Sequence, residues 1–190
     1  MNKPAVFIDR DGTINEQMGY INHLSRFRLI PGVPEAIRLL NENNFLAIIV
    51  TNQSGVARGY FPISLVREVH SFMEESLKNA GAFVDGIFFC PHYPTGKVSE
   101  YTIECDCRKP KTGLIDQALD SFDIDISRSY MVGDHSTDME LAHNCGLKGI
   151  MVKSGYGLGE VKNVLPQMAL RPSYIADDLL DAVNRILEGG

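Results

Sequence analysis

The stretch Val6-Phe7-Ile8-Asp9-Arg10-Asp11-Gly12-Thr13 decides the fold and the chemistry that the sequence predicts. Its apolar run is rich in β-branched and aromatic residues and follows Pro4, which predicts a short buried strand. The strand delivers two carboxylates, Asp9 and Asp11, to its carboxyl end, where open parallel α/β sheets bind ligands. The alternative is an ordinary turn, because Asp and Gly are common turn residues.

Two carboxylates this close repel each other, and a divalent cation between them would keep both ionised. Such a pair suits phosphoryl transfer. One Asp can attack phosphorus while Mg2+ offsets the charge of both reactants, and the second Asp can handle the proton of the leaving group.

Strands and helices alternate along the rest of the chain. Apolar runs predict strands at 45–50, 86–89, 129–132 and 148–152. Apolar residues at helical spacing predict helices over 31–43 and 64–80, from residue 113, up to Gly146, and after Asp177 or Asp178. Residues 15–27 and 154–171 are expected to be mostly loop. This alternation implies a right-handed, doubly wound parallel sheet of the α/β class.

Length and composition set broad limits. The 190 residues, 44% hydrophobic and 22% charged, fit one globular domain over 1–190, and no linker divides the chain. The net charge of -6 argues against nonspecific binding to nucleic acid. No apolar run approaches the ~18 residues of a membrane span, and the first ten residues lack the pattern of a signal peptide. We therefore expect a cytoplasmic protein that binds no membrane.

The second strand runs into Thr51-Asn52-Gln53-Ser54-Gly55. Small hydroxyl and amide side chains beside a glycine can surround phosphate oxygens without adding charge. Arg58 follows and can add a cation. A plain strand-to-loop turn is the alternative.

Three thiols and one imidazole gather between residues 90 and 107. Cys90, His92, Cys105 and Cys107 form a Cys3His set, one of the usual tetrahedral structural zinc sites, although one residue separates the members of each pair where two are more familiar. A disulfide involving Cys90, or three unrelated thiols, are the alternatives, but cytosolic redox conditions and the clustering weigh against them. Four protein ligands leave no open position, so the zinc would be structural and would staple a loop that has no core of its own.

Basic residues follow the last thiol directly. Lys109 is the expected charge partner of the transferred phosphoryl group, and Arg108, with its bidentate fork, suits recognition of a second anionic group. A solvated run of charge is the alternative.

The fourth predicted strand ends in Gly133-Asp134-His135-Ser136-Thr137-Asp138. Asp134 can supply a third carboxylate to an octahedral Mg2+ site. Asp138 can cap the next helix or orient its neighbours. His135 can face the substrate or be structural.

These motifs together resemble the haloacid dehalogenase superfamily of phosphatases. Asp9-x-Asp11-Gly-Thr, Thr51-Asn52, Lys109 and Gly133-Asp134-x-x-x-Asp138 occur in the order of its four motifs. The stretches 9–15, 51–59 and 90–109 resemble more narrowly the D-glycero-D-manno-heptose 1,7-bisphosphate phosphatases, in which a zinc loop replaces a large cap domain. The histidinol-phosphate phosphatases share these features.

The resemblance implies a role for each motif residue. Asp9 would be the nucleophile that forms an aspartyl phosphate, and Asp11 the general acid and base. The Asp9 carboxylate, the Asp11 backbone carbonyl and Asp134 would hold Mg2+. Thr51 and Lys109 would steady the phosphoryl group. The expected substrate-binding residues are Arg10, Gln17, Met18, Gly19, Tyr20, Asn52, Gln53, Ser54, Arg108 and His135. His135 stands where the heptose enzymes have a Lys, which leaves its substrate contact open.

The expected function is removal of the C7 phosphate from heptose 1,7-bisphosphate, on the way to ADP- or GDP-heptose and lipopolysaccharide. Histidinol-phosphate phosphatase is the nearest alternative, and an inactive, zinc-stapled binding module is an alternative of another class. With no large cap, a monomer is expected.

Overall fold

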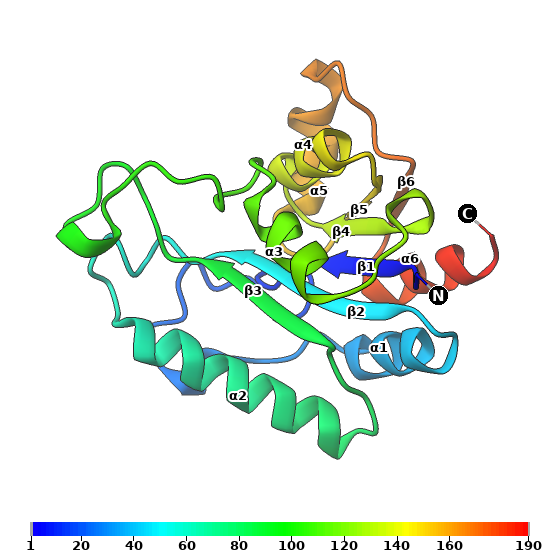
Figure 1. The fold of residues 1–190 in the computed structure, drawn as a ribbon, viewed down its shortest axis with the longest axis horizontal. Helices are drawn as coiled ribbons and strands as arrows, with labels where there is room; N and C mark the ends of the chain where they lie inside the picture. Colours follow the sequence, from blue (N-terminus) through cyan, green and yellow to red (C-terminus); the bar gives the residue numbers. More distant parts are fainter. Residues whose placement is uncertain (1, 190) are drawn as a thin grey trace.

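The computed structural model describes residues 2–189, and within them six parallel strands form one sheet in the order β3-β2-β1-β4-β5-β6 (Figure 1). The sheet comprises β1 (Ala5–Ile8), β2 (Leu46–Asn52), β3 (Gly86–Cys90), β4 (Tyr130–Gly133), β5 (Lys148–Val152) and β6 (Tyr174–Ala176). Ile8 of β1 pairs with Ile49 of β2 and with Val132 of β4. The carboxyl ends of these three strands therefore meet at one edge of the sheet, and the strand order reverses direction between β1 and β4.

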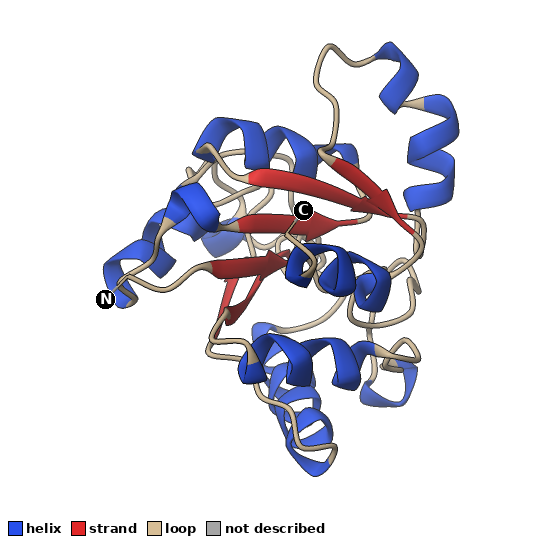
Figure 2. Ribbon diagram, turned by 90° about the vertical axis from the view of Figure 1, so that its right-hand side faces the viewer, coloured by secondary structure: helices blue, strands red, loops and turns tan. Residues whose placement is uncertain are grey.

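Helices cover both faces of this sheet (Figure 2). They are α1 (Val33–Glu42), α2 (Ile63–Asn79), α3 (Gly113–Ser121), α4 (Ser136–Cys145), α5 (Gly157–Asn163) and α6 (Leu179–Leu187). One core cluster joins Val6 and Ile8 of β1 to the apolar faces of α1, α2 and α6, and a second joins Phe7 to α3 and α4. Alternate residues of β1 thus face opposite layers, which is why its sequence is apolar without interruption.

The predicted doubly wound α/β fold is confirmed, with two differences. The prediction of loop over 154–171 is wrong, because residues 157–163 form α5, whose sequence Gly-Leu-Gly-Glu-Val-Lys-Asn has little apolar periodicity. The sixth strand, β6, has only three residues, too few for a period to show. The last helix is capped by Asp178, whose carboxylate accepts a hydrogen bond from the Asp181 N–H at 3.0 Å.

The predicted site residues lie in the last residues of β2 and β3 and in the connections that follow β1, β2, β3 and β4. The connection from β3 to α3, residues 91–112, holds most of the predicted zinc loop, and Cys90 is the last residue of β3. Within residues 2–189, none of the helices has the length and apolar character that a membrane span requires.

Candidate active site

Three buried carboxylates meet where β1 and β4 end. Asp9 follows β1, Asp134 follows β4, and Asp138 lies in the first turn of α4. One carboxylate oxygen from each lies within 4.8 Å of the others, and the exposed fractions are 8%, 2% and 0%. We call these three residues the acid trio.

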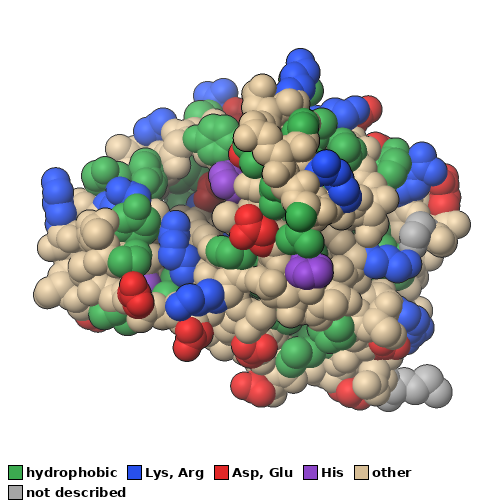
Figure 3. Space-filling model, turned by 90° about the horizontal axis from the view of Figure 1, so that it is seen from above, with side chains coloured by type: hydrophobic (Ala, Val, Ile, Leu, Met, Phe, Trp, Pro, Cys, Tyr) green, Lys and Arg blue, Asp and Glu red, His purple; other side chains and the backbone are tan. Residues whose placement is uncertain are grey.

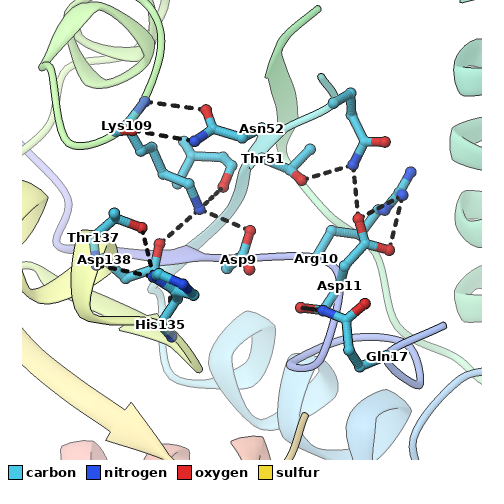
Figure 4. A network of polar contacts seen from close by, with 12 residues as sticks. Asp9, Arg10, Asp11, Gln17, Thr51, Asn52, Lys109, His135, Thr137 and Asp138 are labelled. Carbon is cyan, nitrogen blue, oxygen red and sulfur yellow. Dashed lines mark hydrogen bonds and ion pairs between the residues drawn. The ribbon is translucent and has the colours of Figure 1, made fainter. Parts of the chain in front are cut away.

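Lys109 is the cation that faces the acid trio (Figure 4). Its Nζ lies 2.7 Å from Asp9 Oδ1 and 2.7 Å from Asp138 Oδ1, and it donates a hydrogen bond to the Val50 carbonyl at 3.0 Å. Asn52 fixes the Lys109 backbone in both directions: it donates to the Lys109 carbonyl at 3.2 Å and accepts from the Lys109 N–H at 3.1 Å. The predicted charge partner therefore reaches the predicted nucleophile from 100 residues away.

The charges of this cluster do not balance, since three carboxylates face one ammonium. Burial raises the pKa of Asp9 to about 6, with Lys109 opposing the rise and Asp138 adding to it. Burial and the neighbouring Asp9 raise the pKa of Asp134 to about 8. Buried carboxylates that repel one another are the oxygen ligands that a divalent cation binds, and a cation would lower both pKa values. The donor set therefore fits a divalent metal.

Glycine allows the backbone to approach Asp134 this closely. A Cβ atom at Gly12, where φ is +92°, would lie 2.0 Å from Asp134 Oδ2, and one at Gly155 would lie 2.1 Å from the same atom. The Tyr156 N–H donates to that oxygen at 2.7 Å. Because these two positions are glycines, the backbone of two loops can close around one oxygen of Asp134 and hold it in place.

The Asp11 carboxylate lies outside the acid trio and is held by its own partners. Arg10 Nη2 donates to both Asp11 oxygens at 2.9 and 2.8 Å, and Gln53 and Asn15 donate to them at 2.8 and 3.0 Å. Burial raises the pKa of Asp11, but the Arg10 charge and these hydrogen bonds outweigh it, so the pKa lies below its ordinary value. The sequence predicted that a divalent cation would offset the repulsion between Asp9 and Asp11. In the structure the Arg10 guanidinium also offsets it.

A cleft of about 390 Å³ opens in front of these groups. Nine of the other predicted residues line it together with Asp9, Asp11 and Asp134: Gln17, Gly19, Tyr20, Thr51, Asn52, Ser54, Arg108, Lys109 and His135. Three expected substrate-binding residues do not. Arg10, 1% exposed, and Gln53, 5% exposed, hold Asp11 from behind, and Met18 packs against the core.

Four lining residues were not among the expected catalytic or substrate-binding residues, namely Arg58, Thr137, Asp138 and Tyr156, although Arg58 was expected to be able to add a cation near the phosphate. Asp138 was expected to cap a helix or orient neighbours, and it does both: its Oδ2 accepts the His135 N–H at 3.2 Å while Oδ1 pairs with Lys109. His135 is the N-cap of α4, with Nδ1 accepting the Thr137 N–H at 3.3 Å, and it still lines the cleft. The capping role and the cleft position therefore coexist.

The four predicted zinc ligands come together in the β3–α3 connection. Cys90 and Cys105 sulfurs are 3.5 Å apart, Cys105 and Cys107 sulfurs 3.3 Å, and His92 Nδ1 lies 3.3 Å from Cys107 Sγ and 3.8 Å from Cys90 Sγ. A tetrahedral ion about 2.3 Å from each sulfur has edges of about 3.8 Å, so the set needs only a small expansion to hold a metal. All three thiols are free, which excludes the disulfide alternative in this structure.

Two arginines line the cleft beside this cluster. Arg108 follows Cys107 and donates to the His92 carbonyl at 3.4 Å. The guanidinium carbon of Arg108 lies 5.1 Å from the centroid of the Tyr93 ring, and that of Arg58 lies 3.7 Å from it. The cleft thus has an acidic side at the sheet edge and a basic, aromatic side at the β3–α3 connection.

Comparisons with known proteins agree with this geometry. A family model described as HAD-hydrolase-like matches residues 106–182. The D-glycero-D-manno-heptose-1,7-bisphosphate 7-phosphatase of Thermosynechococcus vestitus is 44% identical over 98% of this chain and 96% of its own length. The D-glycero-beta-D-manno-heptose-1,7-bisphosphate 7-phosphatase of Escherichia coli K12 is 40% identical over 96% of this chain and 93% of its own length.

A solved structure has the same architecture. The D,D-heptose 1,7-bisphosphate phosphatase of B. bronchiseptica, complexed with magnesium and phosphate, superposes with a TM-score of 0.85. It is 28% identical, and the match covers 98% of this chain and 99% of that one. The fold is therefore one that carries a divalent metal in a relative.

Proposed function

Since the chain belongs to the D-glycero-D-manno-heptose-1,7-bisphosphate 7-phosphatases, a family of HAD-like hydrolases, we propose that it removes the C7 phosphate of D-glycero-D-manno-heptose 1,7-bisphosphate. The observation that carries this proposal is the acid trio closed by Lys109, in a chain 44% identical to such a phosphatase over 98% of its length. A place in the synthesis of ADP- or GDP-heptose for lipopolysaccharide is part of the proposal.

Asp9 is the proposed nucleophile. A carboxylate oxygen of Asp9 forms a bond to phosphorus, and the bond from phosphorus to the C7 oxygen breaks. Asp11 gives a proton to that oxygen, and then takes one from the water that attacks the aspartyl phosphate and releases inorganic phosphate. The ion pair between Arg10 and Asp11 supports the role of Asp11 as a base, because it lowers the pKa of Asp11 and keeps it ionised. A phosphate dianion bound beside Asp11 would raise that pKa and favour the protonated form that acts as the acid.

Lys109, Thr51 and Asn52 are proposed to hold the phosphoryl group. Lys109 already lies 2.7 Å from Asp9, so its charge is next to the atom where phosphorus bonds, and Asp138 fixes that ammonium from the far side. Asn52 acts through the Lys109 backbone as well as by facing the cleft. Gln17, Gly19, Tyr20, Ser54, Arg108 and His135 are the proposed substrate contacts.

We propose Mg2+ as the catalytic metal, held by the Asp9 carboxylate, the Asp11 backbone carbonyl and Asp134. When bound, Mg2+ neutralises charge on the phosphoryl oxygens and on the acids. The raised pKa values of Asp9 and Asp134 support a cation at this place, since burial and, to a smaller extent, repulsion between the acids disfavour their charged forms, and a cation would offset both effects.

We propose structural Zn2+ for Cys90, His92, Cys105 and Cys107. The four ligand atoms already lie within 4.8 Å of one another, and four protein ligands leave no position for substrate. The 22-residue connection around them, 91–112, contains one 3-10 turn and has little core of its own.

The two alternative functions have less support. A histidinol phosphate carries a cationic amine, which would favour a carboxylate where the cleft instead presents Arg58 and Arg108. An inactive binding module would have no need of three buried, mutually repelling acids, which cost stability when no metal is present.

We propose a small sugar bisphosphate as the partner, and neither nucleic acid nor membrane. On the face seen in Figure 3, Lys and Arg side chains are interspersed with Asp and Glu, unlike a basic stripe for nucleic acid. A reducing compartment such as the cytoplasm would keep the three clustered thiols available to a metal, and we propose that location together with a monomeric state.

Phosphate release with Mg2+ tests the function. The substrates are both anomers of heptose 1,7-bisphosphate, histidinol phosphate and p-nitrophenyl phosphate. We expect one bisphosphate anomer to exceed the other substrates by ~100-fold or more in kcat/KM, about 2.7 kcal/mol of differential transition-state binding. Preference for histidinol phosphate would contradict the proposed substrate, and turnover of none would contradict the proposed chemistry.

A further inference from the structure

His135 has a fixed tautomer where it lines the cleft. It is the N-cap of α4, and its Nδ1 accepts the Thr137 N–H at 3.3 Å (Figure 4). A backbone N–H can only donate, so Nδ1 holds a lone pair and the neutral imidazole carries its proton on Nε2. The side chain is 46% exposed and forms part of the cleft wall. Nε2 is therefore the ring nitrogen that is left to donate a hydrogen bond.

Glu160 of α5 lies beside this imidazole. Its Oε2 accepts the Ser136 N–H at 2.7 Å, and its Oε1 lies 3.8 Å from His135 Nε2. That separation is too long for a hydrogen bond, so the Nε2 proton stays available, but the carboxylate still attracts it. The Glu160 side chain is only 12% exposed and is not part of the cleft wall. Glu160 can therefore affect a bound substrate only through its neighbours.

The segment that carries Glu160 is fastened to the loops of the acid trio. Ser154 Oγ donates to the Gly12 carbonyl at 2.6 Å, and the Tyr156 N–H donates to Asp134 Oδ2 at 2.7 Å. This segment continues directly into α5, on which Glu160 lies. The Glu160 carboxylate thus has a defined position relative to the loop that carries Asp134 and His135.

We infer that Glu160 is a positioning residue, which holds the His135 imidazole so that Nε2–H donates to an uncharged hydroxyl of the sugar. This inference rests on the proposed function and adds a residue to it. The Thr137 N–H holds one side of the ring and Glu160 the other, and together they fix the ring plane, which the Thr137 bond alone leaves free to turn. An anion is the wrong ligand for this donor, because a carboxylate 3.8 Å from Nε2 repels it.

The test compares kcat/KM for heptose 1,7-bisphosphate, which has sugar hydroxyls, with kcat/KM for p-nitrophenyl phosphate, which has none. Glu160→Gln is the decisive variant. Its amide oxygen can still accept the Ser136 N–H, while its NH2 group can only donate and repels the His135 Nε2–H. His135→Ala and the double variant H135A/E160Q complete a double-mutant cycle. Glu75→Gln, exposed on α2 and outside the cleft, is the control.

We expect the ratio of kcat/KM for the bisphosphate to that for p-nitrophenyl phosphate to fall at least about fivefold in E160Q, mainly through a higher KM for the sugar. Fivefold corresponds to about 1 kcal/mol, the size of one hydrogen bond. The ratio should fall at least as far in H135A, should fall no further in H135A/E160Q, and should keep its wild-type value in E75Q. If Glu160 only stabilised α4, both substrates would be affected alike and the ratio would not change.

An unchanged ratio in E160Q would overturn the inference. An equal further fall on adding E160Q to H135A would also overturn it, since Glu160 would then act without His135. If E160Q does not fold, Glu160→Asp, whose carboxylate is one methylene shorter, decides by the same criteria. Wild-type enzyme with no preference for the sugar bisphosphate over p-nitrophenyl phosphate would show instead that the proposed function has failed, and the inference with it.

Discussion

Acidification should destabilise the protein through His70, a residue on α2 that the proposed chemistry does not use. Its side chain is buried at 6% exposure against Phe89, and within residues 2–189 its Nε2 has no hydrogen-bond partner. Burial lowers the pKa of His70 from 6.5 to about 3; the positive charge of Arg10 acts in the same direction and Asp11 opposes it. Between pH 6.5 and about pH 3, His70 therefore stays neutral in the folded protein but binds a proton in the unfolded chain.

The sign and size follow from that difference. Well above pH 6.5 neither state is protonated at His70, and the residue contributes no pH dependence. As the pH falls from 6.5 toward 3, only the unfolded state gains the proton, so the free energy of unfolding decreases. At pH 5.0 the loss is about 2 kcal/mol, because the unfolded histidine is then about 97% protonated while the folded one is almost wholly neutral.

Urea unfolding at pH 7.5 and pH 5.0 measures this loss in the wild type and in His70→Leu. Other groups that titrate, and any loss of metal, affect both proteins and cancel in the comparison. We expect H70L to lose about 2 kcal/mol less than the wild type between the two pH values. His143, exposed on α4, supplies the control: His143→Leu should lose as much as the wild type. Equal losses in H70L and the wild type would refute the reasoning.

Three further predictions concern the site. Asp9→Asn should lower kcat at least about 1,000-fold while thermal unfolding of the metal-free protein is unchanged or improved, since one of three repelling carboxylates is gone; substantial turnover would contradict the nucleophile assignment. Cys105→Ser should lose zinc, as measured by elemental analysis, and its Tm should fall by several degrees. Cys145→Ser, outside the cluster, should keep the metal. A stable, zinc-free C105S would disprove the stabilising role of the metal. Gly12→Ala should lower kcat/KM at least about tenfold and lower the free energy of urea unfolding by about 2 kcal/mol. The control is Gly81→Ala, where φ is +76° but nothing lies within 4 Å of the added Cβ, and it should cost less. Equal costs would mean that backbone strain alone matters and that the Asp134 contact does not.

The sequence predicts the site as far as strand ends can place it. Parallel strands put their carboxyl ends at one edge, so Asp9, Thr51 and Asp134 could be assigned to the same place before any distance was known. The spacing of Cys90, His92, Cys105 and Cys107 predicted a cluster that the structure assembles. Long periodic helices such as α2 were predicted to within one residue at each end, because their apolar face repeats over several turns.

Side-chain direction could not be predicted in the same way. Arg10 follows Asp9 directly and was expected to contact the substrate, yet its guanidinium turns into the protein and holds Asp11. Nothing in the local pattern says which side of a loop a side chain takes, because the partners come from other segments, here Gln53 from the loop after β2. For the same reason Asp138 was expected only to cap or to orient, and its pairing with Lys109 was not foreseen.

The two predicted metals would have opposite electrostatic roles in the cleft. At the sheet edge, three acids outnumber one lysine, and a cation is required before a phosphate can approach. Across the cleft, Arg58 and Arg108 contact the same aromatic ring, and neither has an ion-pair partner among residues 2–189, so something other than charge must hold them there. The backbone around Cys90, His92, Cys105 and Cys107 does so through Tyr93 and through its hydrogen bonds to Ala57, the residue before Arg58. The proposed Mg2+ would thus offset excess negative charge, while the proposed Zn2+ would keep excess positive charge in position.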